Sequence, residues 1–285
     1  MNREFVNYQK KHDFLLCLDS DGTAMNTMET KHQKCFGPAF VEEWGLEPYR
    51  SRVLDLWNNI NLYSDLRGVN RFYGLYITLA YVNANITPVG DLEPLRHWMD
   101  STKQYSNASL IRYMEDDDSP LLKKVLHWSQ KASEMILTMP ISERGPFAGV
   151  EETLSYASEF CDIVVVSSEN PDALSEEWEH YGLSYYTSLV LSQNAGSKEY
   201  CIAQFLDMGY EKDKVLMIGD GLDDLEAAQN QGVLFYPITI RRETQCWDRL
   251  QNYALDSFLD GHYAGDYAGK LIYEMQSALS SDYET

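Results

Sequence analysis

The 285-residue sequence lacks long hydrophobic runs, paired cysteines and concentrated basic charge. No apolar run reaches the roughly eighteen residues of a membrane-spanning helix, and the opening residues, MNREFVN, contain no apolar signal segment. The five cysteines form no close pair and no metal-binding spacing, which argues against a disulfide framework and against zinc. We therefore expect a cytoplasmic protein with no membrane partner.

Positive charge is scarce as well. The chain has 23 Lys and Arg against 44 Asp and Glu, a formal net charge of −21. Nucleic acids are bound by clusters of Lys and Arg, so the absence of a basic run excludes them as partners. An anionic substrate would also be repelled, and its site must gather local positive charge. The 20 tyrosines and the length favour a folded chain of one or two domains over intrinsic disorder.

Two short apolar runs end in acidic residues. Residues 14–18 (FLLCL) precede Asp19 and Asp21 in the turn DSDGT, and residues 215–218 (VLMI) precede Asp220 in GDGLDD. Such brief apolar runs are typical of parallel strands buried on both faces. The carboxyl ends of these strands are where open α/β sheets bind ligands. We interpret the two ends as one catalytic site; an acidic turn with Thr23 as a helix N-cap is the alternative.

Carboxylates from two strand ends can converge on one hard cation. Mg²⁺ suits such a site because it takes oxygen ligands, keeps several waters and binds through one or two carboxylates. Asp220, nearest the strand end, is the expected direct ligand. Asp224, one helical turn later, is expected to hold a lysine or an outer-sphere water, and Asp223 competes for that role. The alternative for Asp223 is an acid that merely favours a helix N-terminus.

Two further segments carry candidate residues. Residues 162–166 (DIVVV) predict a third buried strand that ends at Ser167, whose hydroxyl can hold phosphoryl oxygens. Turn chemistry is the alternative for that serine. Lys198 opens a predicted helix, a position that the helix macrodipole disfavours for a cation. Its place therefore points to a function, although most lysines are simply solvated.

In chain order, these four segments resemble the haloacid dehalogenase superfamily of phosphohydrolases. Its first signature corresponds to DSDGT at residues 19–23, and its second to the strand that ends at Ser167. Its third corresponds to Lys198 and its fourth to Gly219-Asp220 with Asp224. The family usually has an aromatic residue between its first two aspartates, where this chain has Ser20.

The resemblance implies an α/β fold in two parts. A three-layer, Rossmann-like core of mainly parallel strands would comprise residues 1–23 and 145–285. An inserted α-helical cap, residues 24–144, would follow the first motif and act as a lid that selects the substrate. A lid of this length favours a small phosphorylated metabolite over a protein substrate.

The resemblance also implies a mechanism of phosphoryl transfer. Asp19 would attack phosphorus and form an aspartyl-phosphate. Asp21 would protonate the leaving oxygen and then activate the water that hydrolyses the intermediate. Lys198 would neutralise charge on the nucleophile and the phosphoryl group, and Ser167 would donate a hydrogen bond to it.

The same resemblance implies a magnesium site. Mg²⁺ would be held by Asp19, the backbone carbonyl of Asp21 and Asp220. Thr23 would orient Asp21. Dehalogenases of the superfamily lack an acid at the position of Asp21, so this residue favours phosphoryl transfer over carbon–halogen cleavage.

The inserted segment has helical patterns and a few candidate substrate contacts. Helices are predicted near residues 53–60, 72–81 and 119–136, the last with Ser119 as N-cap. Arg67 and Arg71, one helical turn apart, are candidates to grip a phosphate, although surface arginines are the simpler interpretation. Phosphonatases of the superfamily use a cap lysine, but we expect Lys31 and Lys34 to be solvent-exposed.

These observations predict a Mg²⁺-dependent hydrolase of a small phosphate monoester. A phosphomutase of the beta-phosphoglucomutase type is an alternative, because it shares these residues and lets a substrate hydroxyl resolve the aspartyl-phosphate. A non-catalytic ligand-binding protein of the same fold is another, and the complete residue set argues against it. The sequence carries no signal for the oligomeric state.

Overall fold

The computed structural model describes residues 3–6, 8–102 and 105–279. The chain divides into two compact units: the first comprises Met1–Met28 and Pro140–Thr285, and the second Glu29–Met139. Among the residues described, no helix combines the length and the apolar character that crossing a bilayer requires.

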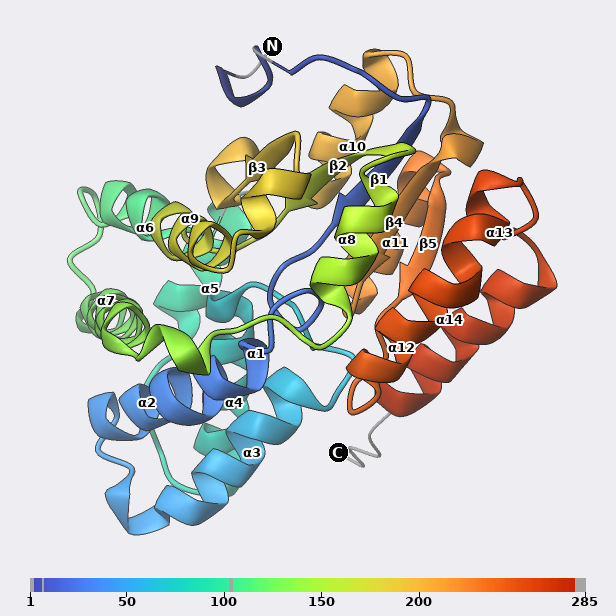
Figure 1. Cartoon of the computed structure of the whole chain (residues 1–285). Coiled ribbons are helices and arrows are strands. Elements are labelled where there is room, and N and C mark those ends of the chain that lie inside the picture. The colour runs from blue at the N-terminus through green and yellow to red at the C-terminus, as the bar shows by residue number, and fades with distance from the viewer. Residues whose placement is uncertain (1–2, 7, 103–104, 280–285) are drawn as a thin grey trace. The chain divides into compact units, whose positions relative to one another are not determined.

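The first unit is built on a five-stranded parallel sheet in the order β3-β2-β1-β4-β5 (Figure 1). Its strands are β1 (Phe14–Leu18), β2 (Cys161–Val166), β3 (Leu189–Leu191), β4 (Val215–Gly219) and β5 (Leu234–Pro237). Leu18 pairs with Val165 of β2 and with Ile218 of β4. The central strand β1 therefore ends beside the ends of β2 and β4, as the acidic strand ends predicted.

Helices cover both faces of this sheet. They are α8 (Val150–Ala157), α9 (Pro171–His180), α10 (Lys198–Asp207), α11 (Leu222–Gln231), α12 (Glu243–Arg249), α13 (Leu255–Leu259) and α14 (Asp266–Leu279). Leu16 and Leu18 of β1 share one apolar cluster with Val150 of α8 and Trp247 of α12. On the other face α11 packs against β4 and β5, with α10 beside it. The three-layer α/β architecture implied by the resemblance is confirmed.

The second unit is helical. Its elements are the end of α1 (Met28–Lys31), α2 (Gly37–Glu43), α3 (Arg50–Leu62), α4 (Arg71–Asn85), α5 (Glu93–Ser101), α6 (Asn107–Tyr113) and α7 (Pro120–Thr138). Trp57, Trp98 and Trp128 are fully buried in its aromatic core. The helices predicted near residues 53–60, 72–81 and 119–136 correspond to α3, α4 and α7. Ser119 precedes α7 as expected, but its side chain makes no capping hydrogen bond; Pro120 alone starts the helix.

Candidate active site

The turn after β1 presents two carboxylates at the end of the sheet. The Ser20 carbonyl accepts hydrogen bonds from the backbone N–H groups of Thr23, Ala24 and Met25 at 3.2, 2.9 and 2.8 Å. Gly22 has a φ of +79°, a conformation that favours glycine. The Asp19 N–H continues the strand pairing by donating to the Ile218 carbonyl at 3.0 Å. This tight turn fixes the backbone on both sides of Asp21.

The Asp19 carboxylate contacts the Lys198 ammonium. Lys198 opens α10 and places its Nζ 3.3 Å from Asp19 Oδ1, 2.9 Å from Asp223 Oδ2 and 2.5 Å from Asp224 Oδ1. Because Lys198 is only 8% exposed, water screens these attractions weakly. The ammonium of Lys198, the residue of the third motif, thus contacts carboxylates of the first and fourth motifs.

Three buried acids form a donor set that fits a hard divalent cation. Asp19, Asp220 and Asp224 each place a carboxylate oxygen within 4.8 Å of the others. The Thr23 hydroxyl bridges two of them, since it lies 3.2 Å from Asp19 Oδ2 and 3.0 Å from Asp220 Oδ1. Lys198 supplies one positive charge, whereas Asp19, Asp220 and Asp224 are three buried carboxylates. The excess negative charge is what a bound Mg²⁺ would balance.

Asp224 is fixed by its backbone contact as well as by Lys198. Its Oδ2 accepts from the Gly221 N–H at 3.1 Å at the start of α11. Asp223 lies in the first turn of the same helix and also contacts Lys198. Both interpretations of Asp223 therefore apply. Asp19, Asp220 and Asp224 together are the buried carboxylates that could hold a metal ion.

Burial shifts the protonation equilibria of this cluster. Loss of water, opposed by Lys198 and reinforced by Asp220 and Asp223, raises the pKa of Asp19 to about 7. Burial lowers the pKa of Lys198, but its attraction to Asp19, Asp223 and Asp224 prevails and raises that pKa well above its ordinary value. Lys198 is therefore a cation at neutral pH.

The Asp21 carboxylate has a different set of neighbours. The Thr27 hydroxyl donates a hydrogen bond to Asp21 Oδ1. We expected Thr23 to orient Asp21, but the Thr23 hydroxyl binds the carboxylates of Asp19 and Asp220 instead. Thr27 was missed because it lies outside the DSDGT turn, where no local pattern marks it.

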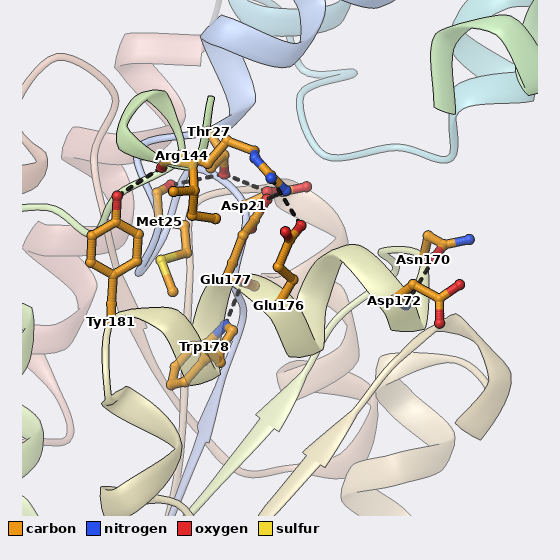
Figure 2. Close-up of polar contacts among 12 residues, drawn as sticks. Asp21, Met25, Thr27, Arg144, Asn170, Asp172, Glu176, Glu177, Trp178 and Tyr181 are labelled. Atoms are coloured by element: carbon orange, nitrogen blue, oxygen red, sulfur yellow. Dashed lines mark hydrogen bonds and ion pairs between the residues drawn. The ribbon is translucent and has the colours of Figure 1, made fainter. Parts of the chain in front are cut away.

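A buried ion pair adjoins Asp21 (Figure 2). Glu169 and Glu177 each place a carboxylate oxygen within 4.8 Å of an Asp21 oxygen. Arg144, 1% exposed, lies 3.4 Å from Glu177 Oε1 and 2.9 Å from Glu176 Oε2. No local pattern in the sequence marks these residues, because isolated charges carry no signal of a pairing between Arg144 and Glu177, 33 positions apart.

Ser167 follows β2 at the same edge of the sheet. It is 5% exposed, and its hydroxyl accepts a hydrogen bond from the Glu169 N–H at 3.2 Å. Because β2 pairs directly with β1, Ser167 and Asp19 follow neighbouring parallel strands. The turn interpretation and the phosphoryl-binding interpretation are compatible, since the hydroxyl hydrogen is not used in this contact.

The candidate residues of the second unit differ from expectation in their placement. Arg67 and Arg71 do not share a helical turn: Arg67 lies in the turn before α4, and Arg71 is the first residue of α4. Arg67 is 1% exposed and donates to the Leu62 carbonyl at 3.1 Å. Arg71 donates to the Ser133 hydroxyl at 3.0 Å. Lys31, expected at the surface, is also buried, so the solvent-exposed interpretation is wrong for it.

Comparisons with known proteins agree with this fold. A candidate phosphoglycolate phosphatase from Lactobacillus delbrueckii subsp. bulgaricus is 17% identical, with a TM-score of 0.50 over 95% of this chain and 100% of that one. A candidate haloacid dehalogenase-like hydrolase from Bacteroides fragilis is 14% identical, with a TM-score of 0.50 over 82% and 93%. At these identities the likeness shows the fold alone. The comparison with curated proteins gives no match.

A family model supplies the assignment that the solved structures cannot. The model described as haloacid dehalogenase-like hydrolase matches residues 92–238, slightly more than half of the chain. The matched span includes Ser167, Lys198 and Asp220, which the structure places at the carboxyl edge of the parallel sheet. The chain therefore belongs to the haloacid dehalogenase-like hydrolases.

Proposed function

We propose that this protein is a Mg²⁺-dependent phosphatase that hydrolyses a small phosphate monoester through an aspartyl-phosphate on Asp19. The observation that carries the proposal is the position of the buried Asp19 carboxylate at the end of β1, beside the Asp220 carboxylate and in contact with the Lys198 ammonium. A carboxylate nucleophile, an acidic metal site and a fixed cation are the groups that phosphoryl transfer requires.

Each side chain has a defined part in this chemistry. The Asp19 carboxylate attacks phosphorus in line, and the bond to the leaving oxygen breaks as Asp21 gives that oxygen a proton. Asp21 then takes a proton from the water that attacks the aspartyl-phosphate, which releases inorganic phosphate and restores Asp19. The Lys198 ammonium and the Ser167 hydroxyl stabilise the negative charge on the phosphoryl oxygens.

The metal would be held by Asp19, Asp220 and the backbone carbonyl of Asp21. Mg²⁺ bound there would offset charge on the transferring group and favour the ionised nucleophile. Thr23 supports this site by holding the Asp19 and Asp220 carboxylates together, at 3.2 and 3.0 Å from its hydroxyl. Asp224 and Asp223 support it by fixing Lys198.

We further propose that the inserted segment predicted at residues 24–144, whose compact helical unit is Glu29–Met139, acts as the substrate-selecting cap. The substrate class is a small phosphorylated metabolite. A cytoplasmic location is supported by the five cysteines, which are buried thiols suited to a reducing compartment.

Phosphate release tests the proposal. The wild-type protein and Asp19→Asn would be assayed against sugar, nucleotide and small-acid phosphates, with Mg²⁺ and with chelator. We expect release that requires Mg²⁺ and is lost in Asp19→Asn. Isomerised product without phosphate release would identify a mutase, and no turnover of any ester by folded, Mg²⁺-loaded protein would contradict the catalytic assignment.

A further inference from the structure

Helix α9 reaches the turn that carries Asp19 and Asp21. Trp178 donates its indole N–H to the Ser20 hydroxyl at 2.9 Å, and both residues are 0% exposed. Figure 2 shows the Trp178 side chain directed toward that turn. Ser20 links Asp19 to Asp21, so this hydrogen bond acts on the residue between the proposed nucleophile and the proposed acid.

The residue before Trp178 also faces this site. Glu177 is fully buried and places a carboxylate oxygen within 4.8 Å of an Asp21 oxygen. Arg144 holds Glu177 in place through its Nη1, and Figure 2 shows its guanidinium directed toward Asp21. A buried ion pair of this kind is costly to disturb, because removing one partner leaves a buried charge uncompensated. Two consecutive residues of α9 therefore adjoin the turn: Trp178 donates a hydrogen bond to Ser20, and Glu177 places its carboxylate near that of Asp21.

Packing alone does not account for these contacts. Trp178 belongs to the apolar cluster under the sheet, and an aromatic ring without a polar atom would fill that space. The buried Ser20 hydroxyl adds a directional bond at the turn. A second indole makes a comparable contact on the same turn, since Trp247 Nε1 donates to the Thr23 carbonyl at 2.9 Å. The turn is thus held by buried hydrogen bonds from α9 and from α12.

We propose that Trp178 and Glu177 are positioning residues for Asp21, and that α9 sets the orientation in which Asp21 meets the leaving oxygen. The inference rests on the proposed function, because it assigns these residues to the proton-transfer step of that reaction. General acid catalysis depends on a correctly placed donor and matters most when the leaving group is a poor one.

The dependence of the rate on the leaving group distinguishes a positioning role for these residues from a role in packing. The rates of Trp178→Phe, Ser20→Ala and Asp21→Asn would be compared with wild type on p-nitrophenyl phosphate and on an alkyl phosphate. We expect Trp178→Phe and Ser20→Ala to lower kcat for the alkyl ester about tenfold or more, part of the roughly 10²–10⁴-fold that general acid catalysis supplies. The aryl ester should lose much less, because its leaving oxygen needs little protonation, and KM should change less than kcat. Ser20→Ala keeps the packing of Trp178, so it reports on the hydrogen bond even where Trp178→Phe folds poorly.

Three further variants complete the test. Trp178→Phe combined with Ser20→Ala should be no slower than either single variant, because both remove the same bond. Glu177→Gln should show the same selective loss for the alkyl ester. Tyr181→Phe is the control: it removes a hydrogen bond from the residue after α9 to the Ile141 carbonyl, 2.7 Å long, and should leave the ratio of the two rates unchanged.

The outcomes separate the inference from the function on which it rests. Equal losses on both esters, or lowered thermal stability without a change in the rate ratio, would overturn the positioning role while phosphate release persists. No selective loss in Asp21→Asn would overturn the acid role of Asp21 and the inference together.

Discussion

Lys198 is the residue on which the charge balance of the site depends. Its ammonium contacts Asp19, Asp223 and Asp224 in a buried setting. Lys198→Met should lower the free energy of unfolding by roughly 3–5 kcal/mol, because it leaves buried carboxylates without their cation. It should also lower kcat by about 10²-fold or more, as for the loss of a preorganised electrostatic donor. Denaturant unfolding and phosphate release measure the two effects.

Lys214→Met is the matched control for that substitution. Lys214 pairs with Glu211 at 3.3 Å, but their side chains are 30% and 69% exposed. Water screens such a pair, so its loss should cost less than about 1 kcal/mol and leave the rate unchanged. Similar unfolding free energies for the two variants would contradict the account of Lys198.

Among individual residues, the sequence predicts those at the ends of strands or the starts of helices. It does not predict those whose role depends on tertiary contacts. Asp19, Lys198 and Asp220 follow strand ends or open a helix, so their convergence was predictable from the order of elements. Thr27 and Arg144 lie outside such patterns. Their contacts with Asp21 and with Glu177 depend on how separate segments pack, which no local spacing encodes.

Among the elements, β4 ends at Gly219, and the missing side chain there leaves room for the Asp224 carboxylate. A Cβ at Gly219 would lie 2.3 Å from Asp224 Cγ and 2.4 Å from its Oδ2. Gly219→Ala should therefore displace the Asp224 carboxylate and, through it, Lys198. A misplacement of about 1 Å can cost about 10²-fold in rate, and we expect a loss of that order in a phosphate-release assay.

Gly269→Ala provides the control at the level of a helix. Gly269 lies within α14, and a Cβ there would meet no atom within 4 Å. The substitution should raise stability by up to about 1 kcal/mol, from the higher helix propensity of alanine, with no effect on rate. Full activity in Gly219→Ala would show that the approach of Asp224 to β4 is not required.

The amino end of β2 carries a hydrogen-bonded network that should serve stability alone. The Tyr210 hydroxyl donates to Asp162 Oδ2 at 2.5 Å and lies 2.6 Å from the Tyr8 hydroxyl. Tyr210→Phe should cost roughly 1.5–3 kcal/mol, the range for hydrogen bonds to charged groups. The rate should not change, because Asp162 and Ser167 lie at opposite ends of β2.

Tyr156→Phe is the surface counterpart of that change. Its hydroxyl donates to Asp256 at 2.9 Å in an exposed contact, so the loss should stay within about 0.5 kcal/mol. Chemical denaturation compares the two variants directly. A fall in kcat for Tyr210→Phe would show that the amino end of β2 also affects the active site, and would contradict a role in stability alone.

Secondary structure was predicted correctly where a helical pattern was long, or where a short apolar run was bounded by turn residues. The strands at residues 14–18 and 215–218 were placed correctly because their apolar runs are short and bounded by turn residues. The placement of Arg67 and Arg71 in one helical turn was wrong, since spacing alone does not show that α4 begins at Arg71. Helix starts depend on capping contacts such as that of the Asn70 side chain with the Phe72 N–H.

At the scale of the whole molecule, the net charge of −21 opposes the approach of an anionic ester. Raising the ionic strength from about 0.01 M to about 0.15 M shortens the Debye length from about 30 Å to about 8 Å. KM for a phosphate ester should therefore fall by about twofold or more over this range, with kcat little changed. Steady-state kinetics in NaCl at fixed free Mg²⁺ tests this. A KM that rises with salt would show that local positive charge governs the encounter.

The proposed mechanism depends on phosphorylation of Asp19, and trapping the aspartyl-phosphate tests that step. The protein would be mixed with Mg²⁺ and a phosphate ester that it hydrolyses, quenched with acid and reduced with borohydride, which converts an aspartyl-phosphate to homoserine. Peptide mass spectrometry should find homoserine at residue 19 in the wild-type protein. It should find none in Asp19→Asn or when chelator replaces Mg²⁺. Reduction at another carboxylate, or none during active turnover, would contradict the assignment of Asp19 as nucleophile.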